Sequence, residues 1–184
     1  MPEFNESNLC FSFKNTWQII KVDDHSDYRS VFQTIPGTKA LDFIGLHGGI
    51  IYFIEVKNYS ASLTFNESKI KGDELSNALA QKFRDTLFIV LAGHHRYQRP
   101  DWQVYATAVG NGTPMRYVAW VELDYQSRNA VDQKRLKTLW SILAQKLKQK
   151  LGHLNQFDRA FHILILSSND QNVLPDLTVY DAPC

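Results

Sequence analysis

Two apolar segments, residues 40–46 and 50–58, flank Gly48-Gly49 and predict a β-hairpin. Tight two-residue hairpin turns require positive φ angles, which glycine adopts without steric cost. A two-residue turn sets His47 opposite Ile50 and, further along the strands, Asp42 opposite Glu55. A longer turn or a bulge would shift the pairing by one residue and still leave the two acids close together.

The end of this hairpin away from the turn carries charge on a face that is otherwise apolar. Side chains alternate along a strand, so Lys57 shares a face with Asp42 and Glu55. Two opposed carboxylates repel each other, and this crowding should raise the pKa of at least one of them while Lys57 opposes the rise. A divalent cation such as Mg²⁺ or Mn²⁺ offsets the repulsion, because carboxylate oxygens are its preferred ligands. An ammonium group beside the ion can orient or deprotonate water, which suits phosphodiester hydrolysis.

A structural ion pair is the alternative interpretation of the same residues. Lys57 would then neutralise Asp42 or Glu55 and serve stability alone. A Glu-x-Lys triplet by itself is common. Here an acid on the paired strand precedes it, within an apolar hairpin, and we therefore favour the metal site.

The segments Lys39-Ala-Leu-Asp42 and Ile54-Glu55-Val56-Lys57-Asn58 resemble the signature of the PD-(D/E)xK nuclease superfamily, which includes restriction endonucleases and Holliday-junction resolvases. Leu41 stands where that signature has proline. The resemblance implies that Asp42, Glu55 and the Val56 carbonyl bind Mg²⁺ or Mn²⁺, and that Lys57 positions or activates the attacking water. It also implies a mixed sheet built in the order helix, three-stranded meander, helix, strand.

The helix after the hairpin carries candidate phosphate-binding residues. Many members of the superfamily have a glutamine there, followed four residues later by lysine or tyrosine, whereas Gln81 is followed by Asp85. We expect Gln81, Lys82 and Arg84 to bind phosphate, although such residues also form ordinary solvated helix faces.

Some members of the superfamily add an upstream acid before the first strand of the meander. We name Asp24 for this role, with Asp23, Asp27 and Glu6 as alternatives. Aspartate near a strand end also caps turns, which is the structural alternative.

Periodicity along the rest of the chain predicts an α/β fold. Strands are expected at 17–22, 117–123 and 161–166 beside the two hairpin strands, and helices at 73–92 and 131–151, with Gly93 ending the first helix. Residues 27–35 and 102–109 fit more than one structure, residues 94–100 read as a loop, and the tail from Ser167 is loop-like. We predict one domain, residues 1–184, with a restriction-endonuclease-like central mixed β-sheet flanked by helices.

Composition narrows the functional class only slightly. The formal net charge of +1 neither favours nor excludes a polyanionic partner. Cys10 and Cys184 lie near opposite ends and form neither a disulfide framework nor a zinc spacing. No leader-like segment or membrane-length apolar stretch is visible, so we expect a cytoplasmic protein.

The expected function is a Mg²⁺-dependent nuclease that acts on DNA, including structured or damaged DNA. The resemblance also implies a homodimer, because members of the superfamily often dimerise. The alternatives are a catalytically silent nucleic-acid-binding or interaction module with the same fold, and a domain whose hairpin only looks like the motif.

Overall fold

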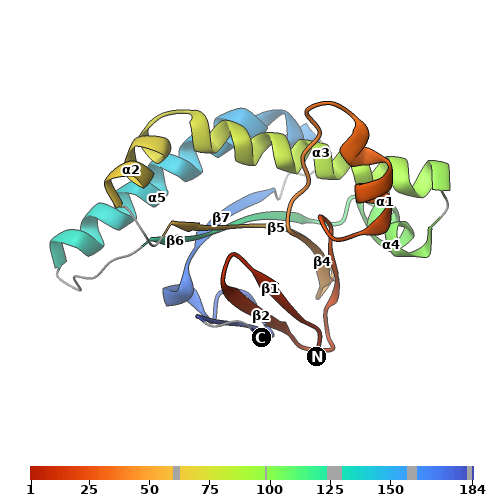
Figure 1. Cartoon of the computed structure of the whole chain (residues 1–184), viewed down its shortest axis with the longest axis horizontal. Helices are drawn as coiled ribbons and strands as arrows, with labels where there is room; N and C mark the ends of the chain where they lie inside the picture. The colour runs from red at the N-terminus through yellow and green to blue at the C-terminus, as the bar shows by residue number, and fades with distance from the viewer. Residues whose placement is uncertain (60–62, 98, 124–129, 157–160, 182–183) are drawn as a thin grey trace.

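A mixed sheet forms the middle layer of the computed structural model, which describes residues 1–59, 63–97, 99–123, 130–156, 161–181 and 184. Within these residues the sheet has five strands in the order β3-β4-β5-β6-β7. The strands are β3 (Gln18–Lys21), β4 (Phe43–His47), β5 (Ile50–Tyr59), β6 (Met115–Leu123) and β7 (His162–Leu166). The first three form an antiparallel meander, and β6 and β7 continue it in parallel. The predicted α/β class with a central mixed sheet is confirmed (Figure 1).

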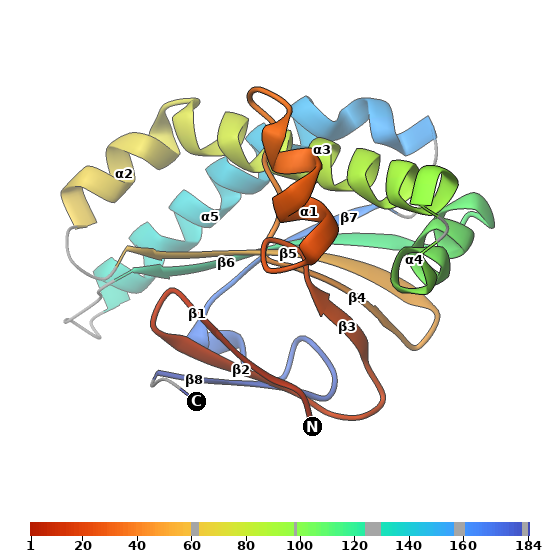
Figure 2. The ribbon, with the colours of Figure 1, turned by 45° about the vertical axis from the view of Figure 1, so that its right-hand side comes forward.

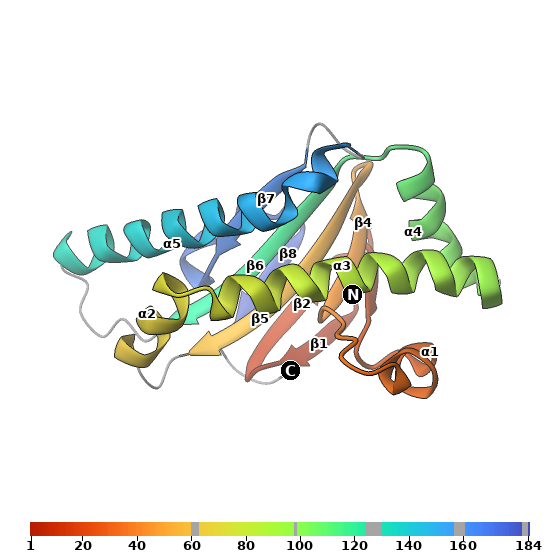
Figure 3. The same ribbon diagram turned by 90° about the horizontal axis from the view of Figure 1, so that it is seen from above.

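The helices lie together on one face of this sheet, where α3 crosses over β5 (Figures 2 and 3). They are α1 (Ser26–Ser30), α2 (Leu63–Lys71), α3 (Glu74–Tyr97), α4 (Pro100–Gly110) and α5 (Ala130–Leu151), with the short 3-10 segments η1 (Phe32–Thr34), η2 (Gly152–Gln156) and η3 (Ser168–Asp170). Parallel strands need such crossover connections, which is why helices separate β5 from β6 and β6 from β7. None of the helices in the described part of the chain is both long and apolar enough to cross a membrane.

A second, smaller sheet covers the opposite face, so the expectation that helices flank the central sheet is wrong for that face. Its strands are β1 (Glu3–Glu6), β2 (Leu9–Phe13) and β8 (Leu177–Tyr180), in the order β1-β2-β8. The tail predicted as loop-like therefore contains a strand, which is too short to give a clear periodic signal. The antiparallel pairing of β2 with β8 joins the N-terminal and C-terminal segments of the chain.

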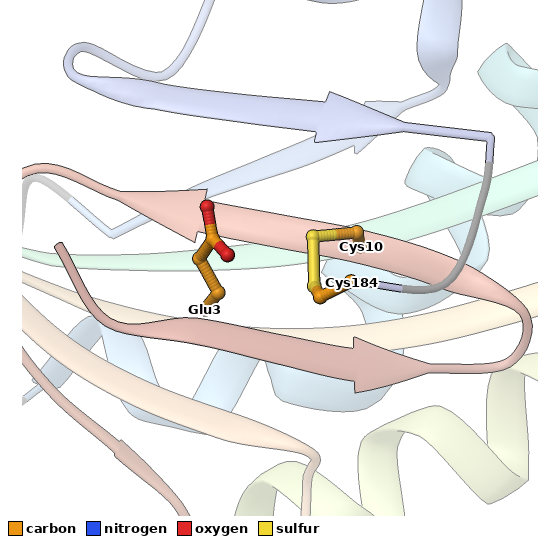
Figure 4. A group of neighbouring side chains, drawn as sticks. All are labelled: Glu3, Cys10 and Cys184. Atoms are coloured by element: carbon orange, nitrogen blue, oxygen red, sulfur yellow. A yellow bond between two sulfur atoms is a disulfide. The ribbon is translucent and has the colours of Figure 1, made fainter.

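A disulfide links Cys10 on β2 to Cys184 (Figure 4). No disulfide was predicted for these cysteines, because residues near opposite ends of a chain meet only through the tertiary fold. Structural disulfides persist mainly in oxidising compartments, so this bond weighs against the expected cytoplasmic location, which stays a prediction.

Two apolar cores fill the spaces between the three layers. Successive residues of β5 alternate between them: Ile51 and Phe53 contact the helix side, whereas Tyr52 and Ile54 contact the small sheet. Because both faces are covered, residues 51–56 of β5 are all buried. The Glu55 side chain, which lies in this run, is therefore held inside the protein.

The helix α3 continues past Gly93, where the sequence predicted its end. A Cβ atom at Gly93 would lie 2.7 Å from Cδ1 of Trp102. The glycine thus permits the close approach of α4. Residues 94–97 of the expected loop belong to α3, and α4 occupies the undecided region 102–109. Of that expected loop, residue 98 lies outside the described residues.

Candidate functional site

The hairpin turn sets the register that brings the two predicted acids together. Gly48 and Gly49 have φ angles of 56° and 73°, as a tight two-residue turn requires. His47 pairs with Ile50 as predicted, and the ladder runs as far as Phe43 opposite Ile54. The predicted register is confirmed.

Asp42 lies one residue before β4 and is tied to both neighbouring strands. The backbone N–H of Val56 donates to Asp42 Oδ2 at 2.6 Å, and the Val22 N–H donates to the Asp42 carbonyl at 2.8 Å. The side chain is buried, with 5 % of the residue exposed. This bond to β5 places the Asp42 carboxylate next to Glu55, on the helix-covered face.

Glu55 is fully buried and is surrounded by cations. Its Oε1 lies 2.6 Å from Lys57 Nζ and 2.6 Å from Lys82 Nζ. Lys82 Nζ also lies 3.8 Å from Asp42 Oδ1, so it stands between the two carboxylates. Glu55 Oε2 has no hydrogen-bond partner among the described residues. The site therefore combines two carboxyl groups and two ammonium groups from the residue before β4, from β5 and from α3.

The electrostatics of the site follow from its burial. Burial, followed by the charge of Glu55, raises the pKa of Asp42 to about 8, against the opposing effects of Lys82 and the Val56 N–H. Burial lowers the pKa of Lys57, but the nearby carboxylates outweigh it, so that this pKa is raised overall. The expected rise in an acid's pKa is confirmed. Its leading cause is burial rather than crowding, and the lysine that opposes it at Asp42 is Lys82.

The helix α3 positions the segment that carries Asp42. The Leu41 N–H donates to Thr86 Oγ1 at 2.8 Å, and the Lys39 N–H donates to Asp85 Oδ2 at 3.1 Å. Lys82 lies one helical turn before Thr86 and therefore points from α3 in a similar direction. One helix thus anchors the segment before Asp42 and supplies a cation to the site.

The other predicted phosphate-binding residues do not reach the carboxylates. Gln81 Nε2 donates to the Gly37 carbonyl at 2.6 Å, and the exposed Arg84 side chain pairs with Asp85 at 2.7 Å. Neighbouring residues on a helix point in different directions, so the site receives Lys82 alone from this group.

The predicted third acid, Asp24, lies at the surface, where it pairs with Arg29 and with Lys21 at 3.2 Å. Two of its three alternatives, Glu6 and Asp23, lie closer to the site. Oxygen atoms of Glu6, Asp23 and Asp42 all lie within 4.8 Å of one another. Burial raises the pKa of Asp23, and Lys21 Nζ pairs with Glu6 at 3.1 Å.

From the sequence, four acids were candidates for this position, but no local pattern shows which of them lies beside Asp42. Glu6 reaches the site because the small sheet folds against the central one, and no local pattern signals that contact. The fourth candidate, Asp27, is buried elsewhere and accepts a hydrogen bond from Trp102 Nε1 at 3.0 Å. Lys21, which pairs with Glu6, was not predicted as a residue of the site.

Comparison of the chain with protein-family models, curated proteins and solved structures finds no match. Buried carboxyl groups can bind a hard divalent cation, and an acid with a pKa of about 8 can exchange a proton near neutral pH. The two ammonium groups can neutralise a phosphate.

Proposed function

We propose that the protein is a metal-dependent nuclease that hydrolyses DNA phosphodiester bonds, with Asp42 and Glu55 holding Mg²⁺ or Mn²⁺ and Lys57 positioning the water. The observation that carries this proposal is the meeting of the two acids on one buried face, with the Lys57 ammonium 2.6 Å from Glu55. In other proteins such an arrangement is a frequent mark of catalysis, although structural ion pairs also produce it.

The arrangement of the strands supports a restriction-endonuclease-like fold. The meander β3-β4-β5 is followed by helices and then by the parallel strand β6, in the order that the resemblance implies. One departure is the N-terminal hairpin of β1 and β2, which precedes the meander in place of a helix. The resemblance is therefore strongest from β3 to β6.

The residues of the site fit a divalent cation. Glu55 Oε2 is buried without a hydrogen-bond partner in the described structure. The raised pKa of Asp42 shows that the surrounding groups do not fully stabilise the negative charge of its carboxylate. Asp42 and Glu55, with the Val56 carbonyl that the resemblance adds, would hold the ion. A bound ion would supply Lewis acidity and lower the pKa of its water.

Lys57 is suited to position a water rather than to remove its proton. Its pKa is raised by the nearby carboxylates, so its amine stays protonated at neutral pH. Its side chain is 30 % exposed, which gives the ammonium group access to solvent at the edge of the site. From there it can donate a hydrogen bond to a water or to a phosphate oxygen.

A second candidate is a catalytically silent module in which the same residues form a structural ion-pair network. The observation that favours it is that two lysines already contact Glu55. In that case Lys57→Ala would break a largely buried pair and cost about 3–5 kcal/mol of stability.

A single variant separates these candidates. Supercoiled, linear and single-stranded DNA would be incubated with the protein and Mg²⁺ or Mn²⁺, with EDTA as the control. We expect Lys57→Ala to retain metal binding in calorimetry and to lose about 10²-fold or more of the cleavage rate. Its stability should change little, because a partly exposed lysine at the polar end of the strand contributes little to the core. A large loss of stability, with no metal-dependent cleavage of any DNA by the wild type, would falsify the nuclease proposal.

A further inference from the structure

Lys82 stands at the position that a metal ion would take. Its Nζ atom lies 2.6 Å from Glu55 Oε1 and 3.8 Å from Asp42 Oδ1, and so bridges the two carboxyl groups. Lys57 also contacts Glu55 Oε1, but from β5 itself and at the edge of the site. The bridging cation is therefore supplied by the helix, across the site from the strands.

An ion and this ammonium group cannot share that space. Oxygen ligands lie about 2.0–2.6 Å from Mg²⁺ or Ca²⁺. Lys82 Nζ lies 2.6 Å from Glu55 Oε1, so it already stands within about the distance at which an ion would bind that oxygen. We propose that Lys82 acts as a built-in cation that closes the metal site of the free protein and leaves it when the ion binds. This inference rests on the proposed function.

The balance of charge supports the exchange. With both acids ionised, the site holds two carboxylates and two ammonium groups in contact, so it is close to neutral. A divalent cation added to this set would leave a large positive charge in a buried place, which is unfavourable. Release of Lys82 removes one of those positive charges.

Unlike the two acids, Lys82 can move. Asp42 is tied to β5 through the Val56 N–H, and Glu55 is fully buried in the sheet. The Lys82 side chain is 20 % exposed and has a flexible four-carbon stem. Once released, its ammonium group stays beside the site, where it can neutralise the phosphate of a substrate.

Metal binding alone tests the inference, without any cleavage assay. Mn²⁺ would be titrated by calorimetry near neutral pH, in one buffer, into the wild type, Lys82→Met and Lys57→Met. We expect Lys82→Met to bind Mn²⁺ about tenfold or more tightly than the wild type, because a competing charge is gone. The matched control, Lys57→Met, should tighten binding less, since Lys57 does not bridge the acids.

A second measurement uses the wild type, so it does not depend on how the variants fold. Lysines would be labelled with an amine-reactive anhydride and read by mass spectrometry, with the exposed Lys148 as the internal reference. Mn²⁺ should speed labelling of Lys82 relative to Lys148, and Asp42→Asn should remove that effect.

The outcomes distinguish this inference from the proposed function. If the wild type binds Mn²⁺ and Lys82→Met binds it equally or more weakly, or if Mn²⁺ leaves Lys82 labelling unchanged, the exchange is overturned while the metal site stands. If no variant binds Mn²⁺, the proposed metal-dependent function fails, and the exchange fails with it.

Discussion

Asp42 is the residue whose environment departs most from that of an ordinary surface acid. It is held by the Val56 N–H, neighbours the buried Glu55, and has Lys82 at 3.8 Å. Its pKa of about 8 lies above the ordinary aspartate value of 3.8 because burial penalises the charged form. The folded protein therefore binds a proton at Asp42 more tightly than the unfolded chain does.

This shift predicts a specific dependence of stability on pH. A raised carboxyl pKa contributes stability that is fully present below the unfolded value of 3.8 and is lost as the pH rises through about 8. The metal-free wild type should therefore lose stability relative to Asp42→Asn between about pH 5 and pH 9, since the amide does not titrate. Thermal melts of both proteins in EDTA check this, and parallel stability curves would contradict it.

At the scale of elements, α3 links the architecture to the site. Thr86 and Asp85 accept hydrogen bonds from the backbone before Asp42, and Lys82 contacts both carboxyl groups. The position of the Asp42 carboxylate thus depends on how α3 packs on the sheet. A change within this helix can therefore alter the site without touching its charged groups.

Thr86→Val tests that link. Valine keeps the shape of the buried side chain but leaves the Leu41 N–H without its acceptor, which should cost about 1–3 kcal/mol. Mn²⁺ binding should weaken as well, because the segment before Asp42 loses an anchor. Denaturant unfolding and calorimetry measure the two effects.

Ser76→Ala is the matched control for Thr86→Val. Ser76 is also a buried hydroxyl residue on α3, but it donates to the Asp73 carbonyl at the start of the helix. Its loss should lower stability and leave Mn²⁺ affinity unchanged. Equal effects of both variants on metal binding would show that Thr86 has no special role in placing Asp42.

At the scale of the whole molecule, the two ends of the chain are joined in the small sheet and by a disulfide. The small sheet pairs β2 with β8, and the disulfide joins residues that are 174 positions apart. A link that closes so long a loop restricts the unfolded chain strongly. The same sheet carries Glu6, which borders the candidate site.

Removal of the disulfide should destabilise the protein without abolishing its fold. The chain-entropy relation gives a loss of up to about 5 kcal/mol for Cys10→Ser. The pairing of β2 with β8 and the apolar core beneath it remain in the variant. Denaturant unfolding should show the loss, and a reductant should lower the wild type to the level of Cys10→Ser. A wild type that is insensitive to reductant would contradict the prediction.

Features that depend on neighbours in the chain could be predicted from the sequence. The Gly48-Gly49 turn, the alternation of side chains and the repeat of apolar residues are local, and they determine the hairpin register and the long helices. For the same reason the common face of Asp42, Glu55 and Lys57 was foreseen. The end of α3 was not, because Gly93 serves packing against Trp102 rather than a helix stop.

By itself, the sequence determined the hairpin and the three charged residues at its end, because a two-residue turn and a period of two leave few alternatives. Tertiary structure alone decided which more distant groups join them. Lys82 was selected over Gln81 and Arg84 by the orientation of α3. Glu6 was brought to the site by the packing of the N-terminal hairpin, where it lies with Asp23 beside Asp42. These contacts join segments that are far apart in the chain, so they depend on how layers pack rather than on any local pattern.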